Sequence, residues 1–240
     1  MAYQNTFKRK EIKYVLNEAQ LAAVQHAMES TMQLDQYGLS TISNIYCDSP
    51  DFEMTRRSIE KPQYKEKLRL RSYGAVHPTD TVYLELKKKY NGTVYKRRLP
   101  LTLGAAMAYL YHGIRPCADC QVLREIDYTV QHYGAVPAVY VAYERMAYFG
   151  KENKEFRITL DFNIRGRMQN LAFGTDDACE VLCTQRYAVM EVKAAAALPA
   201  WLITALSENC IYPASFSKVG RIYTKFLMNN KEKNICLKAS

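Results

Sequence analysis

Residues 64–73 read Tyr64-Lys65-Glu66-Lys67-Leu68-Arg69-Leu70-Arg71-Ser72-Tyr73. Successive side chains of a β-strand point to opposite faces of a sheet, so this stretch predicts a strand with cations on one face and leucines on the other. Cations on one face of a strand lie only about 7 Å apart, and they repel one another unless an anion lies along them. The alternative interpretation is a solvated outer face of an antiparallel sheet, so we searched the other segments for the same pattern.

Length and charge narrow the class of protein. The chain has 240 residues, of which 48% are hydrophobic and 19 are tyrosines, as is typical of a globular protein with a large core. The formal net charge of +9 favours an anionic partner, which could be nucleic acid, a phosphorylated metabolite, polyphosphate or a membrane surface. Without repeats, low-complexity tracts or linkers, residues 1–240 are expected to form one domain with its core over about 7–227.

Features of membrane and secreted proteins are missing from the sequence. No apolar run reaches the length of about 18 residues that a membrane span needs, and the first residues lack the apolar core of a signal peptide. The seven cysteines are an odd number at irregular positions, which argues against a secreted disulfide framework. We therefore expect free thiols and a cytoplasmic protein, and a membrane-protein partner is left open.

Alternation of polar and apolar residues recurs in further segments. Strands are expected over residues 7–15, 41–47, 64–73, 81–99, 138–147, 156–161 and 188–192. Helices are expected after Asn17 (with Leu21, Val24, Met28 and Met32 on one face), from Asp51 to Glu60, over 101–111 and 119–133, from Pro199, and from Ser215 or Ser217. The polar faces of the strands carry Arg9, Glu11 and Lys13; Lys67, Arg69 and Arg71; Glu85 and Lys87; Lys96 and Arg98; Tyr143 and Arg145; Arg157 and Asp161; and Glu191 and Lys193.

Asn91-Gly92 is a strong signal for a two-residue hairpin turn. Such a turn pairs Lys87 with Lys96 and Glu85 with Arg98, and directly opposed residues share one face of the sheet. Arg97 then falls on the apolar face, which suggests a bulge or a shifted register.

A polar face that is rich in Lys and Arg on so many strands predicts an α+β protein built on an antiparallel β-barrel. Its lumen would be charged and water-filled, and helices would flank the apolar exterior. Arginine suits bidentate phosphate binding, lysine supplies point charges, and the few carboxylates could hold a divalent metal. This combination suits phosphoryl transfer, which depends on positioning and charge neutralisation. A basic sheet face for nucleic acid is the alternative, but aromatic residues on the basic faces are sparse and no nucleic-acid-binding signature is present.

Several short motifs occur in the same order as in a known family. They are Arg9-x-Glu11-x-Lys13-Tyr14, Lys67-x-Arg69-x-Arg71-x-Tyr73, Leu84-Glu85-Leu86-Lys87, Arg157-Ile158-Thr159-x-Asp161, Met190-Glu191-Val192-Lys193 and Ser215-Phe216-Ser217-Lys218. From about Phe7 to Leu227 the chain resembles the VTC domain, the polyphosphate polymerase domain of the vacuolar transporter chaperone complex. That domain belongs to the triphosphate tunnel metalloenzymes, or CYTH-like superfamily. The resemblance implies a tunnel that takes ATP and moves its γ-phosphoryl group onto inorganic polyphosphate, with manganese or magnesium as cofactor.

The resemblance also implies roles for particular residues. Residues that grip phosphates in catalysis would be Lys13, Arg69, Arg71, Lys87, Arg145, Arg157 and Lys218. Further substrate contacts are expected from Arg9, Lys67, Tyr143, Lys193 and Ser217, and the hairpin register adds Lys96 and Arg98. Glu191 would be the principal metal ligand, with Glu11 and Glu85 as further candidates. Ser217-Lys218 begins a helix, and the positive end of a helix dipole favours an anion.

Two departures from the family pattern bear on the reaction. Tunnel triphosphatases begin with Glu-x-Glu-x-Lys, whereas Arg9 stands at the first position here, so a polymerase is favoured over a hydrolase. Val219 follows Lys218 where an aromatic residue is usual, which leaves that end of the tunnel open to question. The expected partners are ATP and polyphosphate, without nucleic acid. The alternatives are a tunnel triphosphatase that hydrolyses inorganic or nucleoside triphosphates, and a non-catalytic binder of polyphosphate or nucleic acid.

Overall fold

The computed structural model describes residues 6–7, 10–60, 62–91, 93–116, 119–174, 179–182, 187–195 and 197–226. Its strands are β1 (Thr6–Phe7), β2 (Lys10–Leu16), β3 (Met32–Asp48), β4 (Tyr64–Tyr73), β5 (Thr81–Tyr90), β6 (Thr93–Thr102), β7 (Val136–Gly150), β8 (Arg157–Arg167), β9 (Glu180–Val181) and β10 (Ala188–Ala194). Its helices are α1 (Glu18–Met28), α2 (Glu53–Ile59), α3 (Leu103–His112), α4 (Gln121–Tyr133) and α5 (Ala200–Glu208). Residues 218–226 are also helical and are called helix 218–226 below.

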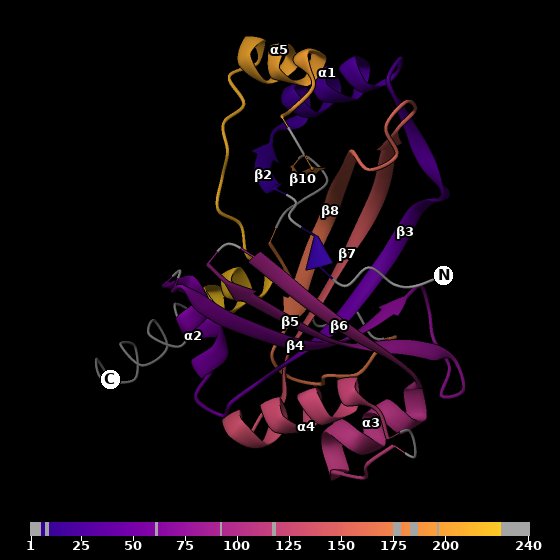
Figure 1. Cartoon of the computed structure of the whole chain (residues 1–240), viewed down its shortest axis with the longest axis vertical. Coiled ribbons are helices and arrows are strands. Elements are labelled where there is room, and N and C mark those ends of the chain that lie inside the picture. The colour runs from indigo at the N-terminus through magenta and orange to yellow at the C-terminus, as the bar shows by residue number, and fades with distance from the viewer. Residues whose placement is uncertain are drawn as a thin grey trace, which may run out of the picture.

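The strands form one antiparallel sheet in the order β1-β6-β5-β4-β3-β7-β8-β10-β2, with β9 beside β8. The strands at the two ends of this order, β1 and β2, are separated in the chain only by residues 8 and 9. The sheet therefore curls until both ends meet at the N-terminal segment (Figure 1). In the described part of the chain no ladder joins β2 directly to β6, so the curled sheet forms a tunnel without closing into a complete barrel. The predicted α+β tunnel architecture is confirmed.

Helices cover the apolar outer surface of the tunnel on two sides (Figure 1). On one side, Leu68 and Leu70 of β4 are fully buried in a cluster that includes Ile126 of α4. On the other side, Val24 of α1 and Leu202 of α5 belong to the cluster that buries the outer face of β2, β8 and β10. Burying such side chains stabilises the fold by about 1.5–3 kcal/mol each. The predicted apolar exterior beneath helices is confirmed, which leaves the charged faces of the strands for the lumen.

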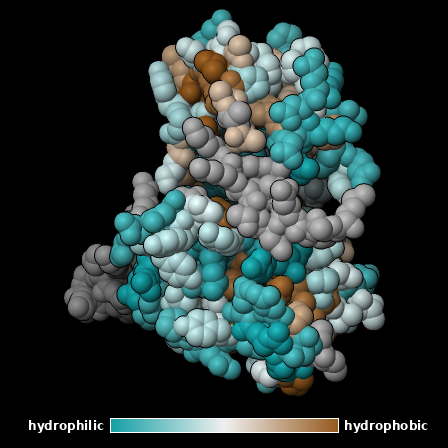
Figure 2. Space-filling model, viewed as in Figure 1, coloured by the Kyte–Doolittle hydropathy of each residue, from teal (hydrophilic) through white to brown (hydrophobic). Residues whose placement is uncertain are grey.

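Surface hydropathy agrees with this division. Figure 2 shows a largely hydrophilic surface over the half built by β4, β5 and β6, while apolar residues gather near α5 at the top. Among the described residues, no helix is both long enough and apolar enough to cross a bilayer. Cys47, Cys120, Cys179 and Cys210 are free thiols.

The β5–β6 hairpin has the predicted register. Lys87 lies opposite Lys96 and Glu85 lies opposite Arg98. Asn91 adopts a φ of 45°, the left-handed conformation that a two-residue hairpin turn favours. Arg97 does face the outer side, but no bulge or slip is needed to explain it. Its Nε atom lies 3.2 Å from Oε2 of Glu125 on α4, so the helix supplies the counter-charge.

The predicted elements differ from the structure mainly in the bounds of the long strands. β3 begins at Met32, which the sequence pattern had assigned to the preceding helix, and it pairs with β7 along most of its 17 residues. A register shift between Leu34 and Leu39, with Gly38 at a φ of 57°, breaks the alternation that would have identified the strand. A second shift between Ala142 and Glu144 marks the β7–β8 ladder. The start of α1 is as expected, because the Asn17 side chain accepts a hydrogen bond from the Gln20 amide at 2.9 Å.

Candidate functional site

The β4–β6 half of the sheet arranges its lumen side chains in rows that cross three strands. From one end of the lumen to the other, the rows are Lys67–Lys87–Lys96, Arg69–Glu85–Arg98 and Arg71–Tyr83–Pro100. Opposed residues in such rows have Cβ atoms about 5 Å apart. The first row therefore sets three lysines side by side, and their ammonium groups contact Ser217, Glu11 and Glu85.

Glu85 is the centre of the second row and is only 1% exposed. Its Oε2 atom accepts hydrogen bonds from Nε and Nη2 of Arg69 at 2.9 and 2.7 Å. Its Oε1 atom lies 2.7 Å from Nζ of Lys96 and accepts from Nε of Arg98 at 2.8 Å. Burial alone would raise the pKa of Glu85, but the charges of Arg69, Arg71 and Lys96 outweigh burial and hold this pKa well below its ordinary value. Glu85 is thus ionised, and cations occupy both of its oxygens.

The opposite wall of the lumen is built by β2, β8 and β10. Glu191 lies opposite Lys13 in the ladder, and Lys193 lies opposite Glu11. The Glu191 carboxylate is 2.8 Å from Nζ of Lys193 and 3.9 Å from Nζ of Lys13. Burial would raise the pKa of Glu191, but the charges of Lys193, Lys13 and nearby arginine outweigh it, so the pKa is lowered and the group is ionised.

One ion pair joins the two walls across the lumen. Glu11 of β2 lies 3.6 Å from Nζ of Lys87 on β5, and its other oxygen lies 3.8 Å from Nζ of Lys13. β2 and β5 are not neighbours in the sheet. The contact therefore shows that both charged walls face the same enclosed space.

A third carboxylate, Asp161 of β8, is fully buried and holds two cations. Arg145 of β7 donates to it through Nε and Nη2 at 2.5 and 2.7 Å, and Lys218 donates through Nζ at 2.5 Å. Burial opposes ionisation of Asp161, but the charges of Lys218 and Arg145 outweigh it and lower its pKa. Tyr143 completes the group, because its hydroxyl accepts from Arg71 at 3.0 Å while Lys218 Nζ lies 4.4 Å from its ring centroid.

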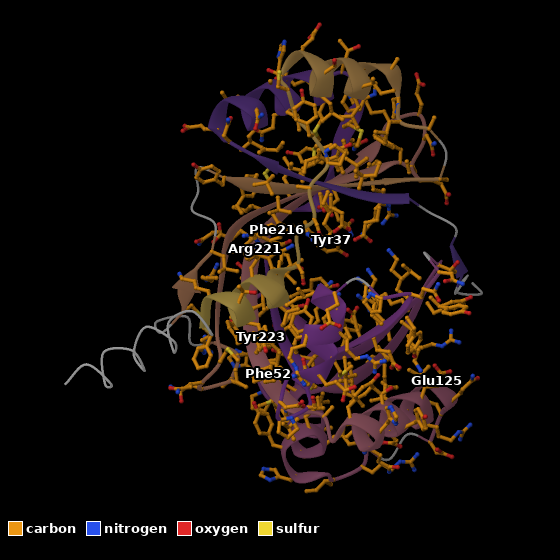
Figure 3. The ribbon with its side chains drawn as sticks, turned by 90° about the vertical axis from the view of Figure 1, so that its left-hand side faces the viewer. Tyr37, Phe52, Glu125, Phe216, Arg221 and Tyr223 are labelled. Carbon is orange, nitrogen blue, oxygen red and sulfur yellow. The ribbon has the colours of Figure 1, made fainter. Side chains whose placement is uncertain are left out.

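Helix 218–226 and the residues that lead into it lie at one end of the lumen. Lys67 donates to Oγ of Ser217 at 3.1 Å, and Lys13 donates to the carbonyl oxygen of Phe216 at 3.1 Å. Val219 is buried in the apolar cluster that Phe216 and Ile222 form with the inner faces of β3, β7 and β8. Viewed from that end, the helix stands between the two halves of the molecule, with Phe216 at its start and Phe52 beside Tyr223 (Figure 3).

The close fit of this helix depends on a glycine. A Cβ atom on Gly166 of β8 would lie 1.9 Å from Cδ1 of Ile222 and 2.5 Å from the carbonyl oxygen of Tyr140. Any larger residue at position 166 would therefore require the Ile222 side chain and the Tyr140 backbone to shift.

The structure brings most of the predicted site residues together. The lumen and its ends hold Glu11, Lys13, Lys67, Arg69, Arg71, Glu85, Lys87, Lys96, Arg98, Tyr143, Arg145, Glu191, Lys193, Ser217 and Lys218. Arg157 lies on the same face, opposite Lys193, but is exposed to solvent. Arg9 lies outside the described residues. Their proposed roles in binding and catalysis stay predictions.

Sequence reasoning missed the contribution of β3. Tyr46 lies opposite Arg69, and its hydroxyl accepts from Nη1 of Arg69 at 3.0 Å, while Asn44 accepts from Nε of Arg71 at 2.9 Å. Burial would raise the pKa of Tyr46, but the charges of Arg69, Lys67 and Arg71 and the hydrogen bond from Arg69 lower it to about 7. The only signal for these residues was alternation along 41–47, because uncharged side chains did not stand out.

The pKa of Lys67 is also shifted from its ordinary value. Burial is the main cause that lowers its pKa to about 8, and the charges of Lys13, Lys65 and Lys87 act in the same direction, while Tyr46 opposes them. An anion beside Lys67 would favour the charged form and raise this pKa again.

Solved structures of known proteins share this architecture. An adenylate cyclase candidate from Bacillus halodurans superposes with a TM-score of 0.55 at 10% sequence identity, over 89% of this chain and 96% of that chain. The adenylyl cyclase candidate HpAC1 from Hippeastrum superposes with a TM-score of 0.50 at 12% identity, over 90% of this chain and 95% of that chain. These likenesses concern the fold, and they define the class: the chain has the same tunnel fold as these two proteins.

The family to which this chain belongs is identified by its sequence, along nearly the whole length of the tunnel. The family described as the VTC domain matches residues 8–226, so this protein belongs to the VTC-domain family. The predicted resemblance is confirmed. Among curated proteins, no sequence matches this chain.

Proposed function

We propose that this protein is a polyphosphate polymerase that transfers the γ-phosphoryl group of ATP onto a growing inorganic polyphosphate chain inside the lumen. The observation that carries the proposal is the pairing of the lumen carboxylates. Glu85, Asp161 and Glu191 are each held by cations of the lumen, and further cations remain beyond those pairs. Such a lumen is built to hold a long polyanion rather than to activate water with free carboxylates.

The reaction needs no covalent intermediate with the protein. An oxygen at the end of the acceptor chain forms a bond to the γ-phosphorus, and the bond from that phosphorus to the β–γ bridging oxygen breaks. The electron pair leaves with ADP. The protein positions the two anions in line and neutralises charge on the transferring group. In this proposal Arg69, Arg71 and Arg145 bind phosphate oxygens bidentately, and Lys13, Lys87 and Lys218 supply point charges.

Two neighbouring carboxylates of the lumen, Glu11 and Glu191, could hold a divalent cation. Glu11 and Glu191 both lie beside the ammonium group of Lys13, at 3.8 and 3.9 Å, so a divalent cation held by these two hard oxygen donors would displace that ammonium group. Magnesium is commonly bound by one or two carboxylates together with substrate phosphates. When bound, the metal would neutralise phosphate charge. We assign the metal to Glu191 and Glu11, because each has an oxygen whose cationic neighbour is 3.6–3.9 Å away. Both oxygens of Glu85 lie within 2.9 Å of cationic donors, so Glu85 organises the arginines and lysines around it.

The product of ATP turnover tests the proposal. Incubating the purified protein with ATP and manganese is expected to yield ADP and a ladder of polyphosphate on a gel. Release of ADP and orthophosphate without a ladder would instead identify a triphosphatase. Binding of polyphosphate without any turnover would leave a binding protein.

A tunnel triphosphatase is the second candidate. HpAC1, which shares the fold, is described as having a dominant triphosphatase activity. Glu11 and Glu191 are the carboxylates that would support water attack in that reaction, and the same assay separates the two functions. We also propose that the protein works in the cytoplasm, where its free thiols would stay reduced.

A further inference from the structure

The charged rows of β4–β6 end in a pair of tyrosines. Tyr83 follows Glu85 on the lumen face of β5, and Tyr73 follows Arg71 on the lumen face of β4. The ring centroids of Tyr73 and Tyr83 are 5.8 Å apart at an interplanar angle of 75°. One end of the basic surface is therefore aromatic, whereas the rows before it carry Lys and Arg.

Arg98 connects this aromatic pair to the charged rows. Its guanidinium carbon lies 4.4 Å from the Tyr83 ring centroid, and its Nη2 atom donates to the Tyr73 hydroxyl at 2.9 Å. Glu85 accepts from Nε of the same guanidinium at 2.8 Å, which fixes the orientation of Arg98. Aromatic rings and guanidinium planes are the groups on which nucleobases stack in proteins.

The tyrosine pair lies at the end of the lumen that faces away from helix 218–226. Lys67, at the other end of the basic face of β4, contacts Ser217 beside that helix. Tyr73 lies six positions along the strand from Lys67, a distance of about 20 Å. Tyr73 is 44% exposed, whereas Arg71, one step further in, is 6% exposed. An entering ligand thus meets an exposed aromatic surface first and buried cations behind it.

We propose that Tyr73, Tyr83 and Arg98 form a stacking platform for the base of the nucleoside triphosphate, with its phosphates directed toward Lys67. This inference rests on the proposed use of ATP and adds how the nucleoside is held. Every base has a π-face, so the platform distinguishes a nucleoside triphosphate from inorganic triphosphate while it discriminates weakly among bases. Purines, which offer the larger ring surface, bind more tightly than pyrimidines.

Binding measurements test the platform without requiring turnover. Isothermal titration calorimetry would compare a non-hydrolysable ATP analogue, the β,γ-imido compound, with inorganic tripolyphosphate on the full chain. The Tyr83→Leu variant is expected to bind the ATP analogue about tenfold more weakly, which equals about 1.4 kcal/mol of binding free energy. Its affinity for tripolyphosphate is expected to stay unchanged. Tyr95→Leu is the matched control, because Tyr95 is a tyrosine of the same hairpin on the outer face, opposite Lys88. It is expected to change neither affinity.

Two results would overturn the platform. If Tyr83→Leu lowered the affinity for both ligands equally, the ring would act by positioning the cations rather than by stacking on the base. If the affinity for the analogue did not change, the base would bind elsewhere. Should Tyr83→Leu fail to fold, Tyr73→Leu at the more exposed ring gives the same comparison. The proposed polymerase activity is tested by a different measurement, because the absence of a polyphosphate ladder would contradict it. The two proposals can therefore be rejected independently.

Discussion

Arg69 and Glu85 face each other across β4 and β5, and the arginine donates twice to a single carboxylate oxygen, at 2.9 and 2.7 Å. The second oxygen of Glu85 serves Lys96 and Arg98 of β6. One buried carboxylate thus fixes cations from two further strands. Its negative charge neutralises cations that a phosphate chain could also neutralise.

Neutralising Glu85 should destabilise the protein in a way that a polyanion repairs. Glu85→Gln leaves buried cations without their partner, so the free energy of unfolding is expected to fall by about 3–5 kcal/mol. Tripolyphosphate should restore more stability to Glu85→Gln than to the wild type, because the ligand takes over the role of the carboxylate. Urea denaturation with and without tripolyphosphate measures both effects. Glu125→Gln, which removes a carboxylate paired with outward-facing Arg97, is the control and should show no such extra rescue.

Adjacent arginines on β6 allow a test of the lumen itself. Arg98→Ala and Arg97→Ala remove the same charge, but Arg98 faces the lumen and Arg97 pairs with Glu125 outside it. Polyphosphate binding is expected to weaken about tenfold or more in Arg98→Ala and to stay unchanged in Arg97→Ala. The salt dependence of binding should become less steep only in Arg98→Ala, because one fewer cation meets the polyanion. Similar losses in both variants would point to binding by overall charge rather than by the lumen.

Tyr46 should make the protein sensitive to pH near neutrality. Its folded-state pKa of about 7 lies below the ordinary value of 10.0, so the folded protein binds fewer protons than the unfolded chain between these values. Tyr46 therefore contributes stability that is present above pH 10 and is lost as the pH falls toward 7. Near-ultraviolet absorbance of phenolate is expected to titrate near pH 7 in the wild type and not in Tyr46→Phe. Tripolyphosphate should raise this pKa by neutralising the cations around the ring, and a phenolate signal that begins only near pH 10 would contradict the prediction.

A substitution at Glu191 should affect metal binding and phosphate binding differently. Glu191→Gln is expected to lower manganese-dependent turnover of ATP by at least about a hundredfold, in line with the loss of a group that organises charge in the transition state. Affinity for tripolyphosphate without metal should stay the same or increase, because a negative charge is removed from the lumen. Electron paramagnetic resonance of bound manganese gives a reading independent of turnover. Glu208→Gln, on the surface of α5, is the control.

Gly166 tests whether helix 218–226 must seat fully for the site to work. Gly166→Ala would force the helix away from β8, because the added Cβ collides with Ile222 and with the backbone of Tyr140. Hydrogen exchange over residues 218–226 should become faster, and phosphate affinity should fall because Lys218 leaves its position beside Asp161. Ala205→Gly on α5, far from the lumen, controls for a small change in residue size. Unchanged exchange in Gly166→Ala would mean that the sheet yields instead of the helix.

Much of this fold could be predicted from local pattern because strand alternation and turn chemistry act over short distances. Asn91-Gly92 and the regular alternation on either side set the hairpin register, which placed Glu85 opposite Arg98 and Lys87 opposite Lys96. The leucines of β4 similarly identified the face that helices cover. A one-residue slip would have reversed every side chain, so correct alternation was enough to find the lumen.

The remainder depends on contacts between distant parts of the chain. Register shifts in the β3–β7 and β7–β8 ladders interrupt the period-two pattern, so the ends of these strands could not be predicted from the sequence. The pKa of Tyr46 is lowered because β3 sets this residue opposite Arg69. The charge of Arg97 is compensated because α4 brings Glu125 next to it. The carboxylates of Glu85 and Asp161 were visible as residues, but their cationic partners come from neighbouring strands and from helix 218–226.

The pairing of β2 with β10, and of Asp161 with Lys218, also sets when the lumen can exist during synthesis. β2 is made near the start of synthesis, yet its ladder partner lies at residues 188–194, and Lys218 comes later still. A growing chain therefore carries its basic strands on the ribosome for most of translation without an enclosed phosphate site. Only after residue 218 has emerged can the last cation take its place, so a chain that stops early exposes the basic face but lacks the complete tunnel.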